Sequence, residues 1–396
     1  MHNRHETRGG ADEVVDQERD LLVDAGHVVD QYLLEPASAD RRGAVNMAVS
    51  AVWNRTVVAE LEARVADFDP DVIHVHTPFP LMSPAALRVG HRTGRPTVTT
   101  AHSFRYACIA GTCLRDGLRC ESCVGSGLKL AGVRHACYHD SRAASAALTV
   151  SLVGHRAMGT FSRSVDRFIT LTAFARDLLV RDGFPAERIT VKPNSVPDPG
   201  SPVPPSLRAP YALFAGRLVA EKGIQTLLTA WQHRPGGLDL YLAGDGPLRS
   251  MVDAEAARNP AIRVLGWCEA QRLAQLQAEA TLTVVPSEWY EAGPPLVLLQ
   301  ALACGTPVVC SDLENICSPV VVGQAGFAFR TGDAQALAGA VQAVVGSPDE
   351  PPGEARAWLG DHARRRYLDE FTPAASLHSL ERIYAEVTHA VATTRS

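Results

Sequence analysis

A doubly wound α/β fold in two domains is predicted by three features of the sequence. Short apolar runs recur along the chain and end at glycine, proline or polar turns. Helical patterns lie between these runs, as expected of repeated β-α units. The chain has 396 residues, which is too many for one core of ordinary size, so we expect two domains of about 150 to 200 residues each.

The apolar runs predict strands. Most lack an alternation of apolar and polar residues, which is typical of strands buried on both faces of a parallel sheet. The runs are DVIHVH (71–76), PTVTTAH (96–102), RFITLT (167–172), YALFAGR (211–217), LDLYLAGDG (238–246), LTVVPS (282–287) and TPVVCS (306–311). Parallel sheets bind ligands beyond the carboxyl ends of their strands, so we expect functional residues in the turns after these runs.

A proline-rich stretch separates two sets of repeats. Residues 193–210 contain seven prolines, so they cannot form a regular helix or a central strand. We interpret this stretch as an interdomain linker between domains at 1–197 and 198–365. Two Rossmann-like halves joined there are expected to face each other across a cleft that holds the site.

Composition and charge exclude several classes of protein. The chain has 46% hydrophobic and 20% charged residues, which is typical of globular proteins. Its net charge of −5 provides no basic field for nucleic acid. No run reaches the roughly 18 apolar residues of a membrane-spanning helix. We therefore expect a soluble cytoplasmic protein without a nucleic acid partner.

Two turns in the second half suit a phosphate group. Gly216-Arg217 closes one strand run, and Glu221-Lys222-Gly223 precedes a helical pattern. Cations beside the unpaired N–H groups at the start of a helix bind phosphate or diphosphate. Ordinary cations on the protein surface would give the same sequence pattern, so this alternative stays open. Gly244-Asp245-Gly246 closes the next run, but Asp-Gly turns are common and indicate little alone.

A third turn carries a carboxylate. Glu291 lies between the run 282–287 and a helical pattern that begins near Pro295. Gly305 is the expected residue after the end of that helix. A carboxylate in this position would accept hydrogen bonds from hydroxyl groups, and the start of the helix would favour a phosphate nearby.

These motifs resemble glycosyltransferase family 4, whose members are retaining enzymes of the GT-B fold. GRLVAEKG, AGDGPL, WYEAGPPLVLLQALACGTPVV and QAGFAF resemble the donor half of that family. The acceptor half is resembled by RGGADEVVDQERDLLVDAGHVV, DVIHVHTPF and VTTAHS. The resemblance covers nearly the whole chain and implies that a C-terminal helix at about 366–396 packs back on the first domain.

The resemblance implies transfer of a hexose from a nucleoside-diphosphate sugar, without a catalytic metal. Arg217 and Lys222 would hold the diphosphate and stabilise the leaving group, Glu291 would bind sugar hydroxyls, and His102 would contact the sugar from the acceptor side. The implied donor-binding residues are Gly9, Gly10, Gly216, Gly244, Asp245, Gly246, Ala292, Gly293 and Gln300. The acceptor, a glycan, lipid carrier or secondary metabolite, and the oligomeric state do not follow from the sequence.

Two departures from the family pattern leave alternatives open. The family usually has a second glutamate after seven intervening residues, whereas here eight residues intervene and Gln300 takes its place. A neutral amide should bind the ribose more weakly than a carboxylate, and Pro294 and Pro295 have no N–H for a phosphate. A non-catalytic sugar-nucleotide-binding protein and a GT-B-fold sugar-nucleotide epimerase are therefore the alternative functions.

The second departure is at the N-terminus. Relatives begin with a hydrophobic strand, and in the doubly wound order that strand is central. This chain has only Met1 before the residues that match the first loop. We expect either a start codon assigned too late or a first domain built without this strand and poorly stable.

The segment 103–140 is a cysteine-rich insert. The Cys120-x-x-Cys123 pair has the spacing of a zinc knuckle, and Cys108 with Cys137 or Cys113 would complete a tetrahedral set. We take Cys108, Cys120, Cys123 and Cys137 as ligands of a structural zinc, with free thiols as the alternative, because the cytoplasm disfavours disulfides. The remaining cysteines are expected in the core: Cys268, Cys304, Cys310 and Cys317.

Histidines and basic residues of the first half have less specific patterns. His74 and His76 fall in one strand, and we expect at most one of them to face the site, with the other packed in the core. The residues before the linker are locally basic, and we interpret them as a solvated face, with contact to the anionic inner face of a membrane as the alternative. They are Lys129, Arg134, Arg142, Arg156, Arg163 and Arg167.

Overall fold

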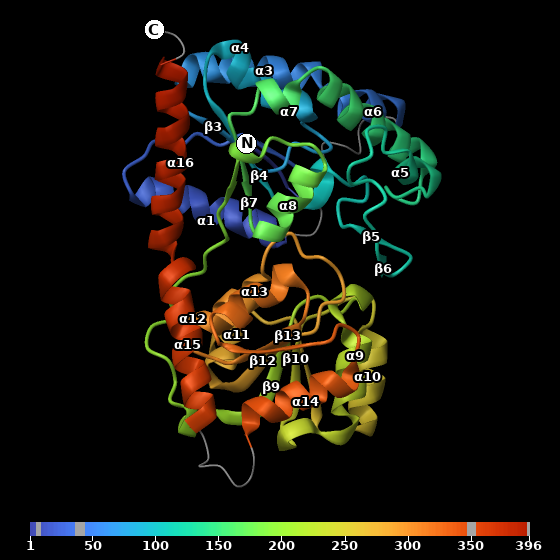
Figure 1. Cartoon of the computed structure of the whole chain (residues 1–396), viewed down its shortest axis with the longest axis vertical. Helices are drawn as coiled ribbons and strands as arrows, with labels where there is room; N and C mark the ends of the chain where they lie inside the picture. Colours follow the sequence, from blue (N-terminus) through green and yellow to red (C-terminus); the bar gives the residue numbers. More distant parts are fainter. Residues whose placement is uncertain (5–8, 36–43, 347–353, 394–396) are drawn as a thin grey trace. The chain divides into compact units, whose positions relative to one another are not determined.

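The computed structural model describes residues 1–4, 9–35, 44–346 and 354–393. The chain divides into two compact units, one formed by residues 1–193 with 376–396 and the other by residues 194–375. Each unit contains a parallel sheet with helices packed against it (Figure 1). The predicted α/β architecture is confirmed.

The second unit contains a six-stranded parallel sheet in the order β11-β10-β9-β12-β13-β14. Its strands are β9 (Ala209–Ala215), β10 (Asp239–Ala243), β11 (Ile262–Gly266), β12 (Ala280–Val285), β13 (Val308–Ser311) and β14 (Gly326–Phe329). The four strands predicted in this half are present, with shifted ends, while β11 and β14 were not predicted. The chain winds outward from β9 in one direction and then restarts at β12 in the other, which is the doubly wound order.

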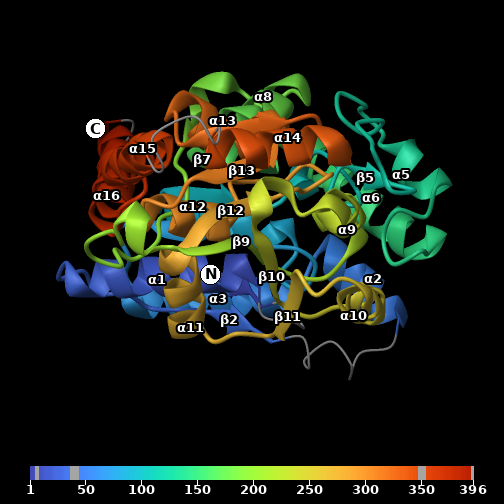
Figure 2. The same cartoon turned by 90° about the horizontal axis from the view of Figure 1, so that it is seen from below.

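Helices cover both faces of this sheet. They are α9 (Ile224–Ala230), α10 (Arg249–Arg258), α11 (Ala270–Glu279), α12 (Leu296–Ala303), α13 (Glu314–Val322), α14 (Ala334–Val345) and α15 (Glu354–Glu370). Alternate residues of β9 point to opposite faces: Phe214 packs in a cluster with Val341 of α14, and Leu213 in a cluster with Leu276 of α11. Figure 2 shows α14 and α11 on opposite sides of the strands. The continuous apolar runs are explained by burial from both sides.

Helix α12 ends as its sequence predicts. Gly305 has a φ of 61° and follows the last helical residues. Its N–H donates to the carbonyl of Leu302 at 3.0 Å, and Thr306 N–H donates to that of Ala301 at 2.9 Å. This pair of hydrogen bonds is a Schellman motif, in which glycine avoids the cost of a left-handed conformation.

The first unit contains a four-stranded parallel sheet in the order β3-β4-β7-β8. Its strands are β3 (Ile73–Val75), β4 (Thr97–Ala101), β7 (Arg167–Thr170) and β8 (Ile189–Val191), with shorter pairs β1 (His2–Asn3) and β2 (Leu33–Leu34), and β5 (Leu114–Arg115) and β6 (Leu118–Arg119). Its helices are α1 (Gly10–Asp24), α2 (Ala44–Val52), α3 (Arg55–Phe68), α4 (Val89–Thr93), α5 (Leu130–Arg134), α6 (Arg142–Ala157), α7 (Thr160–Arg163) and α8 (Ala173–Arg181).

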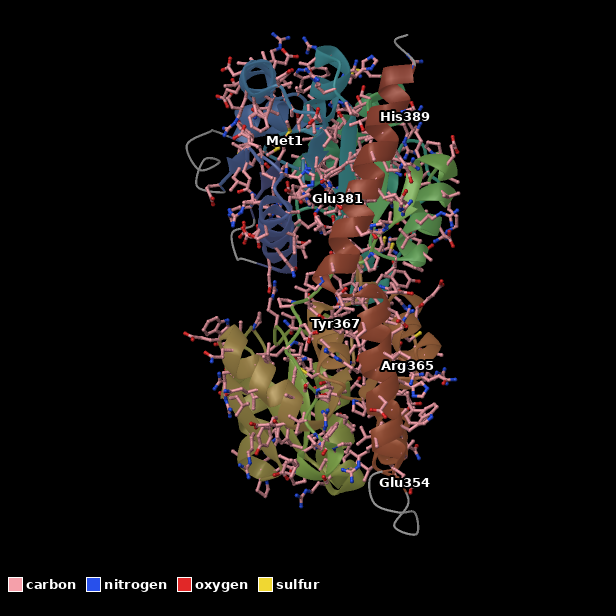
Figure 3. The ribbon with its side chains drawn as sticks, turned by 90° about the vertical axis from the view of Figure 1, so that its left-hand side faces the viewer. Met1, Glu354, Arg365, Tyr367, Glu381 and His389 are labelled. Carbon is pink, nitrogen blue, oxygen red and sulfur yellow. The ribbon has the colours of Figure 1, made fainter. Side chains whose placement is uncertain are left out.

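The expectation that this sheet lacks its middle strand is wrong. Met1 to Arg4 run between β2 and β3: Arg4 N–H donates to Leu34 at 2.9 Å, and Asn3 N–H donates to Thr77 at 3.1 Å. On the β3 side, His76 N–H also donates to the carbonyl of Met1 at 3.0 Å. Pairing uses the backbone, so polar residues that resemble a loop can occupy this place. Met1 is labelled in Figure 3.

The C-terminal segment forms two helices where one was predicted. Helix α15 ends at Glu370, and α16 spans Pro373–Thr393; Figure 3 labels residues along both. Residues Leu380, Ile383 and Val387 of α16 pack against Val98 and Ile169 of the first sheet. Residues 394–396 of the predicted helix lie outside the described part of the chain. Within the described residues, no helix combines the length and apolar character needed to cross a membrane.

Close packing of two turns makes Gly244 indispensable, and its replacement tests the fold of the second unit. A Cβ atom at Gly244 would lie 1.9 Å from the carbonyl oxygen of Gly216. Because backbone must move to relieve this contact, we expect Gly244→Ala to lower the free energy of unfolding by about 2 to 3 kcal/mol. Urea unfolding followed by circular dichroism measures the change.

Gly339 provides the matched control. It lies inside α14, and a Cβ there would meet no atom within 4 Å. Gly339→Ala should stabilise the protein by about 0.5 to 1 kcal/mol, because glycine is a poor helix former. Equal effects of the two substitutions would contradict the packing explanation.

Candidate functional site

The turns after β9 and β12 form the candidate site of the second unit. The strand order reverses between these two strands, and ligands of doubly wound sheets bind at this reversal. The turns are joined by a hydrogen bond of 2.8 Å from Glu288 N–H to the carbonyl of Glu221. A second bond of 2.5 Å joins the Thr226 hydroxyl to the Glu288 carboxylate. The two predicted motifs therefore lie together although about 70 residues separate them.

Glu291 and Lys222 form an ion pair within this site. Their side chains are 13% and 23% exposed. Oε1 of Glu291 accepts from Lys222 Nζ, from Ser287 Oγ at 3.0 Å and from Trp289 Nε1 at 2.9 Å. All three donors reach the same oxygen, so within the described residues Oε2 is left to accept from a ligand hydroxyl.

Arg217 differs from Lys222. It is exposed, and within the described part of the chain its guanidinium has neither an ion-pair nor a hydrogen-bond partner. A solvated guanidinium presents two parallel N–H groups to an anion without first breaking a bond to the protein. The site thus contains one cation held by a carboxylate and one that is free.

The predicted glycine turns have a packing function. Leu218 N–H donates to the carbonyl of Asp245 at 2.9 Å, so the turn after β9 lies directly on the turn after β10. A Cβ at Gly246 would come within 2.7 Å of the Leu218 carbonyl oxygen. Asp245 is engaged within its own turn, where its carboxylate accepts from Gly246 N–H at 2.7 Å. Close contact between two backbones is sufficient to explain Gly244 and Gly246.

The start of α12 completes this site. Pro295 is the N-cap residue, and its carbonyl accepts from Leu298 N–H at 2.9 Å. The preceding Ala292 and Gly293 are partly buried, and Asn315 holds the loop through the carbonyl of Glu291. Gln300 is partly buried on α12, and its side chain has no hydrogen-bond partner among the described residues. The structure does not bring Gln300 into contact with Glu291.

His102 lies at the end of β4 in the first unit, within a network of histidines. Its Nε2 is 2.9 Å from Nδ1 of His76. The rings of His74 and His76 stack with their centroids 4.1 Å apart, and His74 contacts Thr100 at 2.8 Å and Tyr384 at 2.7 Å. Residues two apart on a strand point to the same side, and of these two histidines it is His76 that contacts His102; that at most one of them faces the site stays a prediction.

Glu18 and Lys192 complete the network and were not predicted. Lys192 Nζ is 2.6 Å from one carboxylate oxygen of Glu18, and His76 Nε2 is 3.6 Å from the other. Glu18 shares the buried face of α1 with Val14 and Val15. An acidic residue on an apolar helix face is therefore the sequence pattern that could have identified it.

The charges of this network are defined by burial and pairing. Burial lowers the pKa of His74 to about 3 and that of His76 well below its usual value. Burial alone would raise the pKa of Glu18, but Lys192 and His74 outweigh it and the net shift is downward. Both histidines are therefore neutral, and the ion pair is Glu18 with Lys192.

Ligand atoms of Glu18, His74 and His76 lie within 4.8 Å of one another, which is close enough for a metal ion. Both ring nitrogens of His74 already have hydrogen-bond partners, however, and the Lys192 ammonium group neutralises Glu18. A divalent cation would face a neighbouring positive charge. The arrangement fits a hydrogen-bond network that orients His102 better than a metal centre.

Gly9 and Gly10 begin helix α1. Gly9 is the N-cap residue with φ of −133° and ψ of −179°, an extended conformation open to any residue. Its N–H donates to the carboxylate of Asp12 at 3.1 Å, and Asp12 contacts His2 at 2.9 Å. The backbone conformation does not require glycine here, so the role predicted from close approach of a ligand stays a prediction.

The basic stretch before the linker is not a solvated face throughout. Lys129 is buried, with its Nζ 2.7 Å from the carboxylate of Asp182. Arg156 pairs with the second oxygen of the same carboxylate. Asp182 is completely buried at the end of α8, so it needs these compensating charges. The expectation of a solvated basic face is therefore wrong for Lys129, while the side chain of Arg156 is partly buried.

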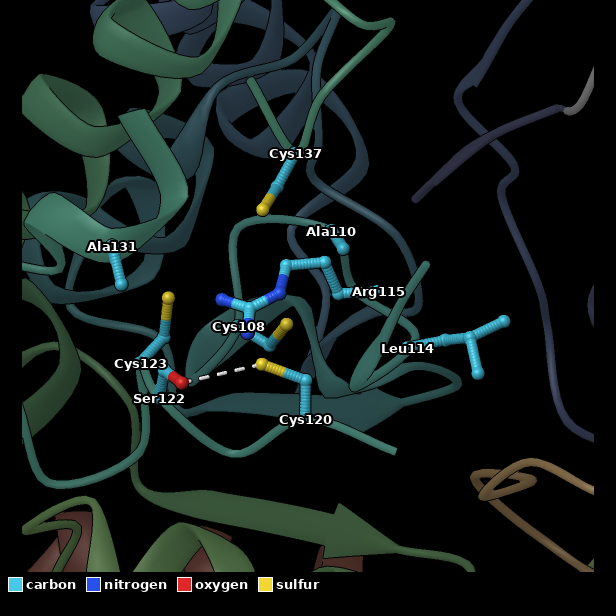
Figure 4. A pocket seen from close by; sticks show the side chains of 9 residues that line it. All are labelled: Cys108, Ala110, Leu114, Arg115, Cys120, Ser122, Cys123, Ala131 and Cys137. Carbon is cyan, nitrogen blue, oxygen red and sulfur yellow. Dashed lines mark hydrogen bonds between the residues drawn. The ribbon is translucent and has the colours of Figure 1, made fainter. Parts of the chain in front are cut away.

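The four predicted zinc ligands line one small pocket of the insert, which Figure 4 shows from close by. All nine cysteines are free thiols. Cys304 and Cys310 are buried in the core as predicted, whereas Cys268 and Cys317 are only partly buried.

The buried histidines make stability depend on pH. The pKa of His74 is about 3 in the folded protein and 6.5 by default. Below pH 6.5 His74 is therefore protonated in the unfolded chain but stays neutral in the folded chain. Stability is complete above that pH and falls as pH decreases, by about 1.4 kcal/mol at pH 5.5 for His74 alone.

Urea unfolding at pH 7.5 and 5.5 measures this effect. His74→Gln, which retains hydrogen-bonding capacity, should lose about 1.4 kcal/mol less than the wild type between the two pH values. His233→Gln, at an exposed position, should behave as the wild type. The same pH dependence in all three proteins would contradict the assignment of neutral, buried His74.

Comparisons with known proteins agree with this arrangement. A family model described as "Glycosyl transferase 4-like domain" matches residues 9–195, and one described as "Glycosyl transferases group 1" matches residues 209–347. A glycogen synthase of Mycobacterium tuberculosis is 31% identical over 165 residues, covering 40% of this chain and 38% of the relative. An O-antigen chain mannosyltransferase B of Escherichia coli is 32% identical over 195 residues, covering 44% and 50%. This chain thus spans half or less of these curated relatives.

Solved structures match nearly the whole chain. Anabaena Alr3699/HepE in complex with UDP has a TM-score of 0.65 at 16% identity and covers 97% of this chain and 98% of its own. A glycosyltransferase from Rickettsia africae has a TM-score of 0.67 at 13% identity, with coverage of 98% and 97%. At such identities the likeness shows the fold, which is two Rossmann-like domains of the GT-B type. With both family models matched in order, the chain belongs to the group 1 glycosyltransferases.

Proposed function

We propose that this protein is a retaining glycosyltransferase that moves a hexose from a nucleoside-diphosphate sugar to an acceptor. The observation that carries the proposal is the ion pair of Lys222 with Glu291 at the reversal of the strand order, with Arg217 on the same turn as Lys222. Two cations suit a diphosphate, and a carboxylate suits the hydroxyls of a sugar. Both features occur on turns that a doubly wound sheet uses for ligands.

In this proposal each of these residues has a separate role in binding the donor. Arg217 is free to bind the diphosphate first, and Lys222 can bridge between the diphosphate and Glu291. When the bond from the sugar's anomeric carbon to the diphosphate breaks, both electrons leave with the diphosphate oxygen. The two cations stabilise that developing negative charge.

Glu291 orients the sugar. Its Oε1 is held by Lys222, Ser287 and Trp289, so the carboxylate cannot rotate freely and Oε2 is fixed for a hydroxyl. Fixing the sugar before reaction removes part of the entropic barrier to transfer. Retention, the hexose and the contact of His102 with the sugar follow from the family resemblance.

The neighbours support a uridine nucleotide as the donor. The Anabaena protein binds UDP and UDP-glucose in its crystal structures. The curated relatives include a mannosyltransferase and an α-maltose-1-phosphate synthase, so a hexose is the group to test. We propose a nucleoside-diphosphate hexose as donor and a glycan, lipid carrier or secondary metabolite as acceptor, with no catalytic metal.

One observation favours a second candidate function. Gln300 provides an amide where the family pattern has a carboxylate, and a site with weakened ribose binding suits a protein that binds sugar nucleotides without catalysis. Incubation with a donor and a range of acceptors separates these functions. A transferase forms a glycoside with retained configuration or slowly hydrolyses the donor, an epimerase changes the sugar, and a binding protein does neither.

Removing the free cation should weaken nucleotide binding. Isothermal titration with UDP, GDP, ADP and dTDP identifies the nucleotide that binds the wild type. Arg217→Ala should then raise its dissociation constant at least tenfold, because a charge-assisted bond to phosphate contributes about 1.5 to 3 kcal/mol. Arg258→Ala, an exposed arginine on α10, should leave binding unchanged. Similar effects of the two variants would place the diphosphate elsewhere.

Restoring the acidic residue on α12 should strengthen binding. Gln300→Glu gives the ribose two charged acceptors in place of one neutral carbonyl, and we expect a three- to tenfold lower dissociation constant, about 0.7 to 1.4 kcal/mol. Gln275→Glu, at an exposed position of α11, serves as the control. The nearby Gln277 is unsuitable because it is buried. An unchanged dissociation constant for Gln300→Glu would show that this residue does not contact the nucleotide.

A further inference from the structure

The cysteine-rich insert has little regular secondary structure and buries apolar side chains mainly in its first residues. Its regular elements are short: β5 and β6 have two residues each, and α5 has five. Leu118, Leu128 and Leu130 are 73%, 61% and 61% exposed. Segments of about 40 residues seldom hold their shape without a crosslink or a metal. Apolar burial is concentrated in the first residues, where Phe104, Tyr106 and Ile109 are buried, so a crosslink or a metal would stabilise the rest of the insert.

Four thiols line one small cavity of the insert. Cys108 follows the 3₁₀ turn Phe104–Tyr106, Cys120 and Cys123 follow the β5–β6 hairpin, and Cys137 follows α5. All four line a cavity of about 10 Å³, and Figure 4 shows their side chains directed into the same space. The cavity has room for about one water-sized atom. Cys113, the fifth cysteine of the insert, does not line it.

The backbone fixes these positions without help from the thiols. Cys120 N–H donates to the carbonyl of Cys113 at 2.7 Å, and Cys137 N–H donates to that of Gly132 at 3.0 Å. At Gly132 a Cβ would lie 2.5 Å from the Cβ of Ile109, so α5 lies directly on the loop that carries Cys108. Three separate segments therefore bring their thiols to one cavity. Among the described residues no three of these sulfur atoms lie within 4.8 Å of one another, so the thiols would move together on binding an ion.

Two arginines, Arg105 and Arg115, lie near the four cysteines. Arg115 lines the same cavity. Arg105 is partly buried, donates to the carbonyl of Ile109 and stacks 4.9 Å over the ring of Tyr138, but within the described residues it has no carboxylate partner. Partly buried cations favour a nearby anion. A metal bound by four thiolates has a net charge of −2, which two arginines would balance.

We propose that Cys108, Cys120, Cys123 and Cys137 bind one structural Zn²⁺ ion in tetrahedral geometry. Each thiol transfers its proton to solvent as its sulfur binds the metal, so four protons leave for each ion bound. Soft sulfur ligands in a tetrahedral set select zinc or an iron–sulfur centre. The cavity is large enough for one ion and too small for a cluster.

The site would give the insert the crosslink that it lacks. The insert begins at Ser103, directly after His102, and its far end is anchored where Lys129 contacts Cys123 and Asp182. Zinc would join the loop after His102 to the CxxC turn and to the end of α5. Its role is structural and separate from the turns proposed to bind the donor, so loss of zinc and loss of nucleotide binding are distinguishable.

Metal analysis of the full-length protein tests the proposal. The protein is produced without a polyhistidine tag in zinc-supplemented medium, purified without chelators and analysed by plasma mass spectrometry. We expect one equivalent of zinc per chain. Cys123→Ser should lose at least nine tenths of it, whereas Cys113→Ser should retain it, because Cys113 lies outside the cavity.

A second measurement avoids dependence on the folding of Cys123→Ser. An organic mercurial that reacts with thiols should release one equivalent of zinc from the wild type and from Cys113→Ser, as read by a chromogenic chelator. The proposal is overturned by less than half an equivalent of zinc in the wild type, by iron in its place, by disulfides among the four cysteines, or by equal zinc loss in both variants.

Discussion

The reversal of strand order between β9 and β12 is the constraint on which the proposed donor site depends. All strands of the second unit are parallel, so their carboxyl ends share one edge. At the reversal the two following turns belong to strands that are neighbours in space and distant in sequence. Lys222 and Glu291 can form an ion pair only because of this arrangement.

Close backbone packing supports the same edge. The turn after β10 lies on the turn after β9 through Gly244 and Gly246, where no side chain fits. These glycines act on the ligand site indirectly, by fixing the loop from which Arg217 extends. In the first unit, segments are fixed by buried ion pairs instead. The buried carboxylates of Glu18 and Asp182 are compensated by lysines at 2.6 and 2.7 Å. Such pairs leave little freedom for the segments that carry them.

The sequence predicted those features that local patterns determine. Continuous apolar runs identified most of the strands, since burial on both faces leaves an unambiguous pattern, and Gly305 marked the end of α12. Residues such as Lys222 and Glu291 were found because they follow strands. The β1 strand was missed because His2 and Asn3 have polar side chains although their backbone pairs. Glu18, Lys129 and Lys192 were missed or misplaced because their burial depends on partners far away in the sequence.

Hydrogen–deuterium exchange tests the central claim that the donor diphosphate binds at the β9/β12 reversal. The protein would be compared with and without saturating UDP, GDP, ADP and dTDP in turn. The account predicts that the nucleotide that binds protects the amides of residues 216–224 and 287–298 more than any other segment of the second unit. Protection confined to other segments, or bound nucleotide without protection in these two turns, would contradict it.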